Sequence, residues 1–150
     1  MLKEGDRAPD IQLQTETGEE FRLSDLKGKR VVLYFYPKAD TPGCTVEACE
    51  FRDDIRKFDK KGVAVIGVSP DKPAAQAKFK DKYSLPFSLL ADPDKAAAQA
   101  FGVWKEKNMY GKKVMGIERS TFVIGPEGKI EKIYAKVKAA GHAGEVLAGL

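Results

Sequence analysis

The residues of this chain best suited to chemistry are two cysteines, Cys44 and Cys49. Together with the one histidine, His142, they make three side chains, whereas a structural zinc site needs four ligands, usually cysteine or histidine. A disulfide that closes so short a loop adds little stability, because the entropic gain grows with loop length. The pair therefore indicates thiol redox chemistry or ordinary core packing. We expect His142 at the surface or at a helix end, without an acid–base partner.

The segment that carries Cys44 reads as the start of a helix. Thr41 is a residue type that caps helices, and Pro42 is favoured at the first helical position. Cys44 then falls in the first turn, where backbone N–H groups lack intrahelical partners and carry the positive end of the helix dipole. Such a site stabilises the thiolate, the nucleophilic form of cysteine. The Thr41 hydroxyl can turn toward the sulfur or toward a bound substrate oxygen.

The spacing of Cys49 sets a geometric condition. In an ideal helix, residues i and i+5 have Cα atoms roughly 8–9 Å apart on different sides, whereas a disulfide needs about 4.4–6.8 Å. If Cys44 and Cys49 pair, the first turns of the helix must unwind. Alternatively, Cys49 is a small buried hydrophobic residue, a common role for free cysteine, and spacing alone does not choose between the two roles.

The elements that must position these cysteines are those of a layered α/β protein. Residues 31–36 and 63–68 are continuous apolar runs of the kind found in strands buried on both faces. Apolar residues between them recur at helical spacing, which predicts a helix over about 42–61. A strand, a helix and a second buried strand predict parallel pairing through a right-handed crossover.

The rest of the chain completes one expected domain, residues 1–150. The alternation of apolar and polar residues at 11–13 and 21–23 predicts an N-terminal hairpin. Further elements are expected as helices over about 73–83 and 94–101, strands over 120–124 and 129–135, and a closing helix over 141–150. The expected fold is α/β and thioredoxin-like, with a central mixed β-sheet flanked by helices and an N-terminal β-hairpin extension.

Composition excludes several classes of protein. The longest apolar run, 31–36, is far shorter than the ~18 residues of a membrane helix. The N-terminal residues are charged and form no signal-peptide core, so we expect a cytoplasmic location. The net charge of +4 is spread among interspersed signs, without the segregated basic face typical of nucleic-acid binding. Glycine-rich phosphate signatures are absent, and no metal, haem or flavin cofactor is indicated.

The same residues resemble a known family. Pro37, Thr41 and Cys44 match the Pro-x-x-x-Thr-x-x-Cys motif of peroxiredoxins. The string over 41–49 resembles the bacterioferritin comigratory protein subgroup, also called peroxiredoxin Q. Further strings look like that subgroup, at 5–9, 101–104 and 112–122. The resemblance therefore extends over nearly the whole chain.

This resemblance implies a thiol peroxidase acting on hydrogen peroxide and organic hydroperoxides. Cys44 would attack the peroxide and become a sulfenic acid, with Thr41, Arg119 and the Cys44 backbone N–H as donors along the O–O bond. Pro37 would shield the site. Cys49 would resolve the sulfenic acid as an intramolecular disulfide after local unwinding of the helix. Thioredoxin or a similar dithiol would reduce that disulfide, and a monomer is the expected state.

Two alternatives would use the same fold. A general disulfide oxidoreductase normally carries a Cys-x-x-Cys motif, and the four-residue gap between Cys44 and Cys49 argues against it. A redox sensor would use the pair as a switch without fast turnover, so the rate of cycling with thioredoxin distinguishes it from an enzyme. We interpret Glu47 as an acidic side chain favoured near a helix N-terminus rather than as part of the chemistry.

Overall fold

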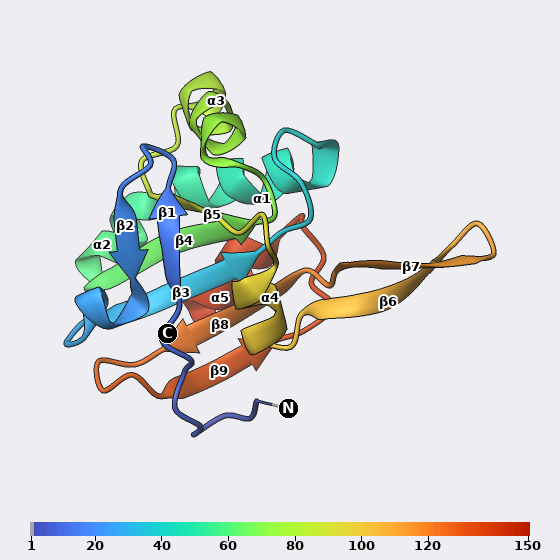
Figure 1. Cartoon of the computed structure of the whole chain (residues 1–150). Helices are drawn as coiled ribbons and strands as arrows, with labels where there is room; N and C mark the ends of the chain where they lie inside the picture. The colour runs from blue at the N-terminus through green and yellow to red at the C-terminus, as the bar shows by residue number, and fades with distance from the viewer. Residues whose placement is uncertain (1) are drawn as a thin grey trace.

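The computed structural model describes residues 2–150, and of Met109 it describes the backbone alone. Within these residues the centre of the molecule is a seven-stranded mixed sheet in the order β2-β1-β5-β4-β3-β8-β9 (Figure 1). Its strands are β1 (Gln12–Thr15), β2 (Glu20–Arg22), β3 (Arg30–Phe35), β4 (Val63–Ser69), β5 (Leu89–Ala91), β8 (Ser120–Ile124) and β9 (Ile130–Tyr134). The β3–β4 and β4–β5 pairs are parallel and the other neighbours antiparallel, which confirms the mixed thioredoxin-like sheet.

Helices cover both faces of the sheet, and alternate residues of β3 pack toward opposite faces. Val31, Leu33 and Phe35 pack into one core cluster, which also holds residues of α4. Val32 and Tyr34 point to the opposite face and pack with residues of α1, α2, α3 and α5, as the two-residue period of a strand requires. The helices are α1 (Pro42–Asp53), α2 (Ile55–Lys60), α3 (Pro73–Tyr83), α4 (Ala96–Ala100) and α5 (His142–Ala148), with a short 3-10 turn η1 (Leu23–Leu26). None of these described helices is long and apolar enough to cross a membrane.

The single helix predicted over 42–61 is in fact two helices. Asp54 lies between α1 and α2 with φ −97° and ψ 4°, outside helical geometry. Aspartate has a low helix propensity, which fits an interruption at this position. The Phe51 and Phe58 rings, one on each side of Asp54, lie 5.7 Å apart between centroids in one buried cluster.

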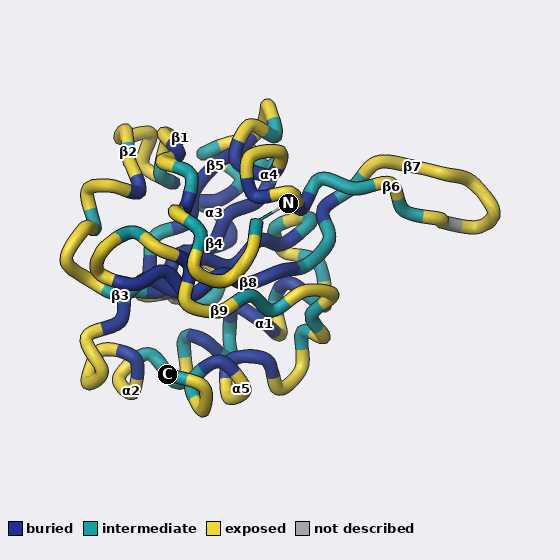
Figure 2. Tube along the Cα trace, turned by 90° about the horizontal axis from the view of Figure 1, so that it is seen from below, coloured by how far each residue is buried: buried dark blue, intermediate teal, exposed yellow. Residues whose placement is uncertain are grey.

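The remaining elements agree with the sequence at most positions and differ at two. The predicted N-terminal hairpin is confirmed as β1 and β2, and it extends the main sheet because β1 also pairs with β5. The three-residue strand β5 is too short for a pattern to reveal. A second hairpin, β6 (Trp104–Met109) and β7 (Lys112–Ile117), was not predicted because its charged residues give little strand signal. It forms its own two-stranded sheet and projects from the body (Figures 1 and 2).

Candidate active site

The start of α1 presents Cys44 as the sequence predicts. Thr41 occupies the N-cap position with φ −94° and ψ 157°, and Pro42 is the first helical residue. Cys44 therefore lies in the first turn, and it exposes only 1% of its surface. Thr41 does not cap the helix with its side chain; the hydroxyl donates to the Lys38 carbonyl at 2.8 Å. Its proton is thus directed away from the sulfur, and the free N–H groups of the first turn stay available.

The loop between β3 and α1 is held by contacts from α3 and from the loop after β4. The Ala39 N–H donates to Asp71 Oδ2 at 2.7 Å. Asp40, in the left-handed region with φ 60°, accepts from Lys82 Nζ at 2.9 Å and from the Tyr83 hydroxyl at 2.9 Å. The hydrogen bond from Lys82 lowers the pKa of Asp40. Half-buried Pro37 follows the buried Tyr36, the first residue after β3.

The Arg119 side chain contacts the sulfur of Cys44. Its Nη2 lies 3.4 Å from Cys44 Sγ, although the residues are 75 positions apart in the chain. The pairing of β3 with β8 accounts for this contact, because Arg119 immediately precedes β8 while α1 follows β3. The Arg119 carbonyl accepts from the Val137 N–H at 2.9 Å, which fixes its backbone. A guanidinium and a helix N-terminus thus both face one sulfur, and both favour its anion.

Gly43 allows this close approach. A Cβ placed on Gly43 would lie 3.2 Å from Arg119 Nη2 and 4.0 Å from the Ala139 Cβ. The first distance is tighter than ordinary van der Waals contact, so a Cβ here would push the guanidinium by a few tenths of an ångström. The packing of Arg119, rather than backbone conformation, therefore favours glycine at this position.

Glu47 is more closely tied to the site than its position near a helix N-terminus indicates. It is fully buried, and its Oε1 accepts from Arg119 Nη1 at 2.7 Å, so that Arg119 bridges Glu47 and Cys44. Burial raises the pKa of Glu47 to about 7, although Arg119 opposes the shift. Burial disfavours the charge of Arg119, but Glu47 and Cys44 outweigh it and raise the pKa of the guanidinium. The i, i+3 spacing from Cys44, which places both side chains on one helix face, was the available signal.

The raised pKa of Glu47 predicts a specific pH dependence of stability. Between about pH 4.5 and pH 7 the folded chain binds a proton at Glu47 that the unfolded chain releases, so the free energy of unfolding falls as pH rises. The contribution is about 3 kcal/mol. Glu47→Gln is expected to remove this fall, as measured by denaturant unfolding across that range. The exposed Glu127→Gln serves as the control, and identical pH profiles for wild type and Glu47→Gln would contradict the prediction.

The structure does not bring Cys49 to Cys44. Both cysteines are free, and both lie in the uninterrupted helix α1. Cys49 is half-buried rather than fully enclosed, which leaves its thiol partly accessible. In the part of the chain that the structure describes, no group of three or more His, Cys, Asp or Glu side chains is arranged to hold a metal ion.

The expectation for His142 is wrong in part. It does begin α5, but only 2% of its surface is exposed. Its Nε2 lies 2.7 Å from the Thr121 hydroxyl and its Nδ1 lies 3.0 Å from Glu145 Oε1, so it has an acidic partner. Burial lowers the pKa of His142, although Glu145 opposes the shift. The ring packs edge-on against Phe51 of α1 and thereby ties α5 to that helix.

Comparison with known proteins gives consistent matches over the whole length of the chain. The model of the AhpC/TSA family matches residues 4–133. A putative peroxiredoxin bcp of Coxiella burnetii is 51% identical over 149 residues, which are 99% of this chain and 99% of that protein. The peroxiredoxin Bcp of Bacillus subtilis is 52% identical over 143 residues, 95% of this chain and 91% of that protein.

The solved structures give the same result. One structure of the bacterioferritin comigratory protein of Xanthomonas campestris was determined in connection with its alkyl peroxide reduction activity. It superposes on this chain with a TM-score of 0.92 at 43% identity, covering 98% of this chain and 96% of that one.

Proposed function

The chain belongs to the AhpC/TSA family of peroxiredoxins, among its Bcp and peroxiredoxin Q members, and on this premise we propose that it is a thiol peroxidase with Cys44 as the peroxidatic residue. The observation that carries this assignment is the 3.4 Å contact of Arg119 Nη2 with Cys44 Sγ at the start of α1. No other cysteine of the chain lies in the first turn of a helix beside a cation.

In the first step the Cys44 thiolate attacks the terminal oxygen of the peroxide. An S–O bond forms as the O–O bond breaks, and the leaving hydroxide or alkoxide takes a proton to become water or an alcohol. Arg119 and the free N–H groups of the first turn stabilise the charge that develops on the oxygens. The resemblance implies Thr41 as a donor along the O–O bond, but its proton is donated to the Lys38 carbonyl, so the Thr41 oxygen acts instead as an acceptor for the peroxide hydrogen. Pro37 shields the sulfur from bulk water.

In the second step Cys49 resolves the sulfenic acid. Its sulfur attacks Cys44 Sγ, an S–S bond forms, the S–O bond breaks, and water leaves. Because an intact helix holds residues i and i+5 roughly 8–9 Å apart at Cα, the first turns of α1 must unwind before the sulfurs can bond. Thioredoxin or a similar dithiol then exchanges with the disulfide and restores both thiols.

Replacing Cys49 by serine is expected to separate these two steps. Cys49→Ser should still consume one equivalent of peroxide, because Cys44, Arg119 and the helix start are unchanged, but turnover with thioredoxin should stop. Stopped-flow peroxide consumption measures the first effect, and NADPH oxidation with thioredoxin and thioredoxin reductase measures the second. Wild type, run in parallel, should form the Cys44–Cys49 disulfide. Full steady-state turnover in Cys49→Ser would show that resolution does not use Cys49.

The proposed substrates are hydrogen peroxide and organic hydroperoxides. Support for the second class comes from the X. campestris relative, whose structure was solved in connection with alkyl peroxide reduction. Resolution within one helix needs no second chain, which supports action as a monomer. We propose a cytoplasmic location, where reduced thioredoxin-type dithiols are maintained.

A further inference from the structure

The exposed large hydrophobic side chains of the described residues lie on two elements, α1 and the β6–β7 hairpin. The large hydrophobic side chains that stand exposed among the described residues are Val46, Tyr110, Val114 and Met115. Val46 lies on α1, two residues after Cys44, and the other three lie on the β6–β7 hairpin. The hairpin projects from the side of the molecule at which α1 begins (Figure 1). Of these, Val46 and Val114 are the exposed apolar groups that a partner seated between the hairpin and the start of α1 would cover.

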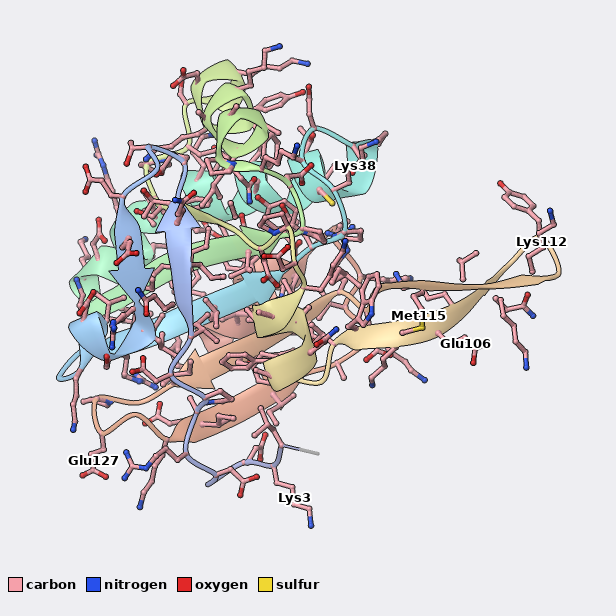
Figure 3. All side chains as sticks on the ribbon, viewed as in Figure 1. Lys3, Lys38, Glu106, Lys112, Met115 and Glu127 are labelled. Atoms are coloured by element: carbon pink, nitrogen blue, oxygen red, sulfur yellow. The ribbon has the colours of Figure 1, made fainter. Side chains whose placement is uncertain are left out.

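The register of the hairpin divides it into two faces. Directly opposed residues of antiparallel strands share a face, and Lys105 opposes Gly116 while Lys107 opposes Val114. Lys112, two residues before Val114, lies on the same side. We call Lys105, Lys107, Lys112 and Val114 the basic face. The opposite face carries Trp104 and Ile117, which pack into the core at the base of the hairpin, and beyond them Glu106, Met115 and Lys113 (Figure 3).

The inner part of the basic face, with Lys107, lies toward the reactive cysteine, whereas Lys112 lies at the outer end of the hairpin (Figure 3). β7 ends at Ile117, two residues before Arg119. Burial lowers the pKa of Lys107 and the nearby charge of Arg119 adds to that effect, while Glu118 and Cys44 oppose it. Of the lysines on this face, Lys105 is paired with Glu118 at 2.8 Å. No carboxylate in the described part of the chain lies within 4.0 Å of the Nζ of Lys107 or Lys112.

The charges of this surface select the kind of partner. In a dimer built from two hairpins, lysines of one copy would oppose lysines of the other, which is unfavourable. A partner with acidic side chains would instead complement Lys107 and Lys112, and an apolar centre would cover Val46 and Val114. Resolution of Cys44 by Cys49 creates a disulfide at this end of the molecule, and the protein that reduces it must reach it there.

We propose that the basic face of the hairpin, together with Val46 on α1, is the docking surface for an acidic dithiol protein that reduces the Cys44–Cys49 disulfide. This proposal rests on the proposed peroxidase cycle. The hairpin holds the reductant against the start of α1, where the unwound helix presents its disulfide. Electrostatic complementarity of this kind acts mainly on the rate of association.

A pair of charge reversals on neighbouring residues tests the proposal. Lys112→Glu alters the basic face, and Lys113→Glu makes the same change on the opposite face of the same strand. With an acidic bacterial thioredoxin, thioredoxin reductase and NADPH, Lys112→Glu is expected to lower kcat/KM for thioredoxin roughly threefold to tenfold. Lys113→Glu is expected to change it less than about twofold, and added salt should weaken the wild-type reaction more than that of Lys112→Glu.

Two further measurements separate docking from chemistry. Turnover supported by dithiothreitol, a small uncharged dithiol, and single-turnover oxidation by peroxide should be the same in wild type and both variants. Equal effects of the two substitutions, or no effect of either, would overturn the docking surface. Wild-type turnover with dithiothreitol but not with thioredoxin would also overturn it, while leaving the peroxidase intact. Failure of wild type with both dithiols would instead remove the proposed function.

Discussion

Replacement of Cys44 by serine is expected to lower peroxide turnover by at least about a thousandfold, as removal of a nucleophile does in other enzymes. A serine hydroxyl in the first turn of α1 is not ionised near neutral pH, and its oxygen cannot take the oxygen of a peroxide as sulfur does. The measurement is NADPH oxidation with thioredoxin, thioredoxin reductase and hydrogen peroxide. Direct peroxide consumption in the absence of reductant should fall to the uncatalysed rate.

The Cys49→Ser variant is the control that separates loss of the first oxidation step from loss of turnover. Both variants lose steady-state turnover, but only Cys49→Ser retains the first equivalent of peroxide consumption. Serine is close in size to cysteine, so the packing of Arg119 against residue 44 and the thermal unfolding midpoint should change little. Wild-type activity in Cys44→Ser would refute the assigned mechanism. Slow cycling of wild type itself, with efficient single oxidation, would favour the redox-sensor alternative.

Replacement of Arg119 by methionine is expected to lower kcat/KM for peroxide by roughly 100- to 1,000-fold, which is the usual effect of removing one group that stabilises developing charge. Methionine retains much of the volume but leaves the reacting oxygens without the guanidinium. The same change leaves the buried Glu47 without its ion-pair partner. Because Arg119 lowers a pKa that burial raises to about 7, Glu47 is protonated near pH 7 once Arg119 is removed, and the unpaired buried carboxyl costs about 1–3 kcal/mol in the free energy of unfolding, measured by denaturant titration.

A double variant distinguishes the effect of Arg119 on chemistry from its effect on folding. Arg119→Met combined with Glu47→Leu removes the cation and the buried carboxyl together, so much of the lost stability should return. Peroxidase activity should not return, because the developing charge still lacks its cation. Recovery of activity together with stability in the double variant would mean that Arg119 serves only to hold the fold, and the 3.4 Å contact with Cys44 would then have no catalytic role.

Much of the fold was predictable because its signals are local. The apolar runs of β3 and β4, the 73–83 helix, and the strands β8 and β9 each rest on residue types within a few positions of one another. The β6–β7 hairpin was not predictable in this way, since its strands are rich in lysine. The interruption at Asp54 is not visible in the pattern, because the helical spacing of Phe51, Ile55 and Phe58 continues through it.

The candidate site likewise has one part that local sequence signals predict and one part that they do not. Thr41, Pro42 and Cys44 determine a helix start with a cysteine in its first turn, and the spacing to Cys49 determines that the helix must open for the two to bond. Both properties follow from backbone geometry over a few consecutive residues, so the local sequence is enough to predict them.

Only the tertiary structure decided what surrounds that cysteine. Arg119 contacts Cys44 because β8 pairs with β3, although 75 positions separate the two residues in the chain. In the sequence, only the family resemblance indicated that Arg119 belongs to the site. The burial of Glu47, the enclosure of His142 and the projection of the hairpin likewise depend on which elements pack together. Local propensities carry no information on such contacts, because the free energy that selects them comes from burying distant side chains against one another.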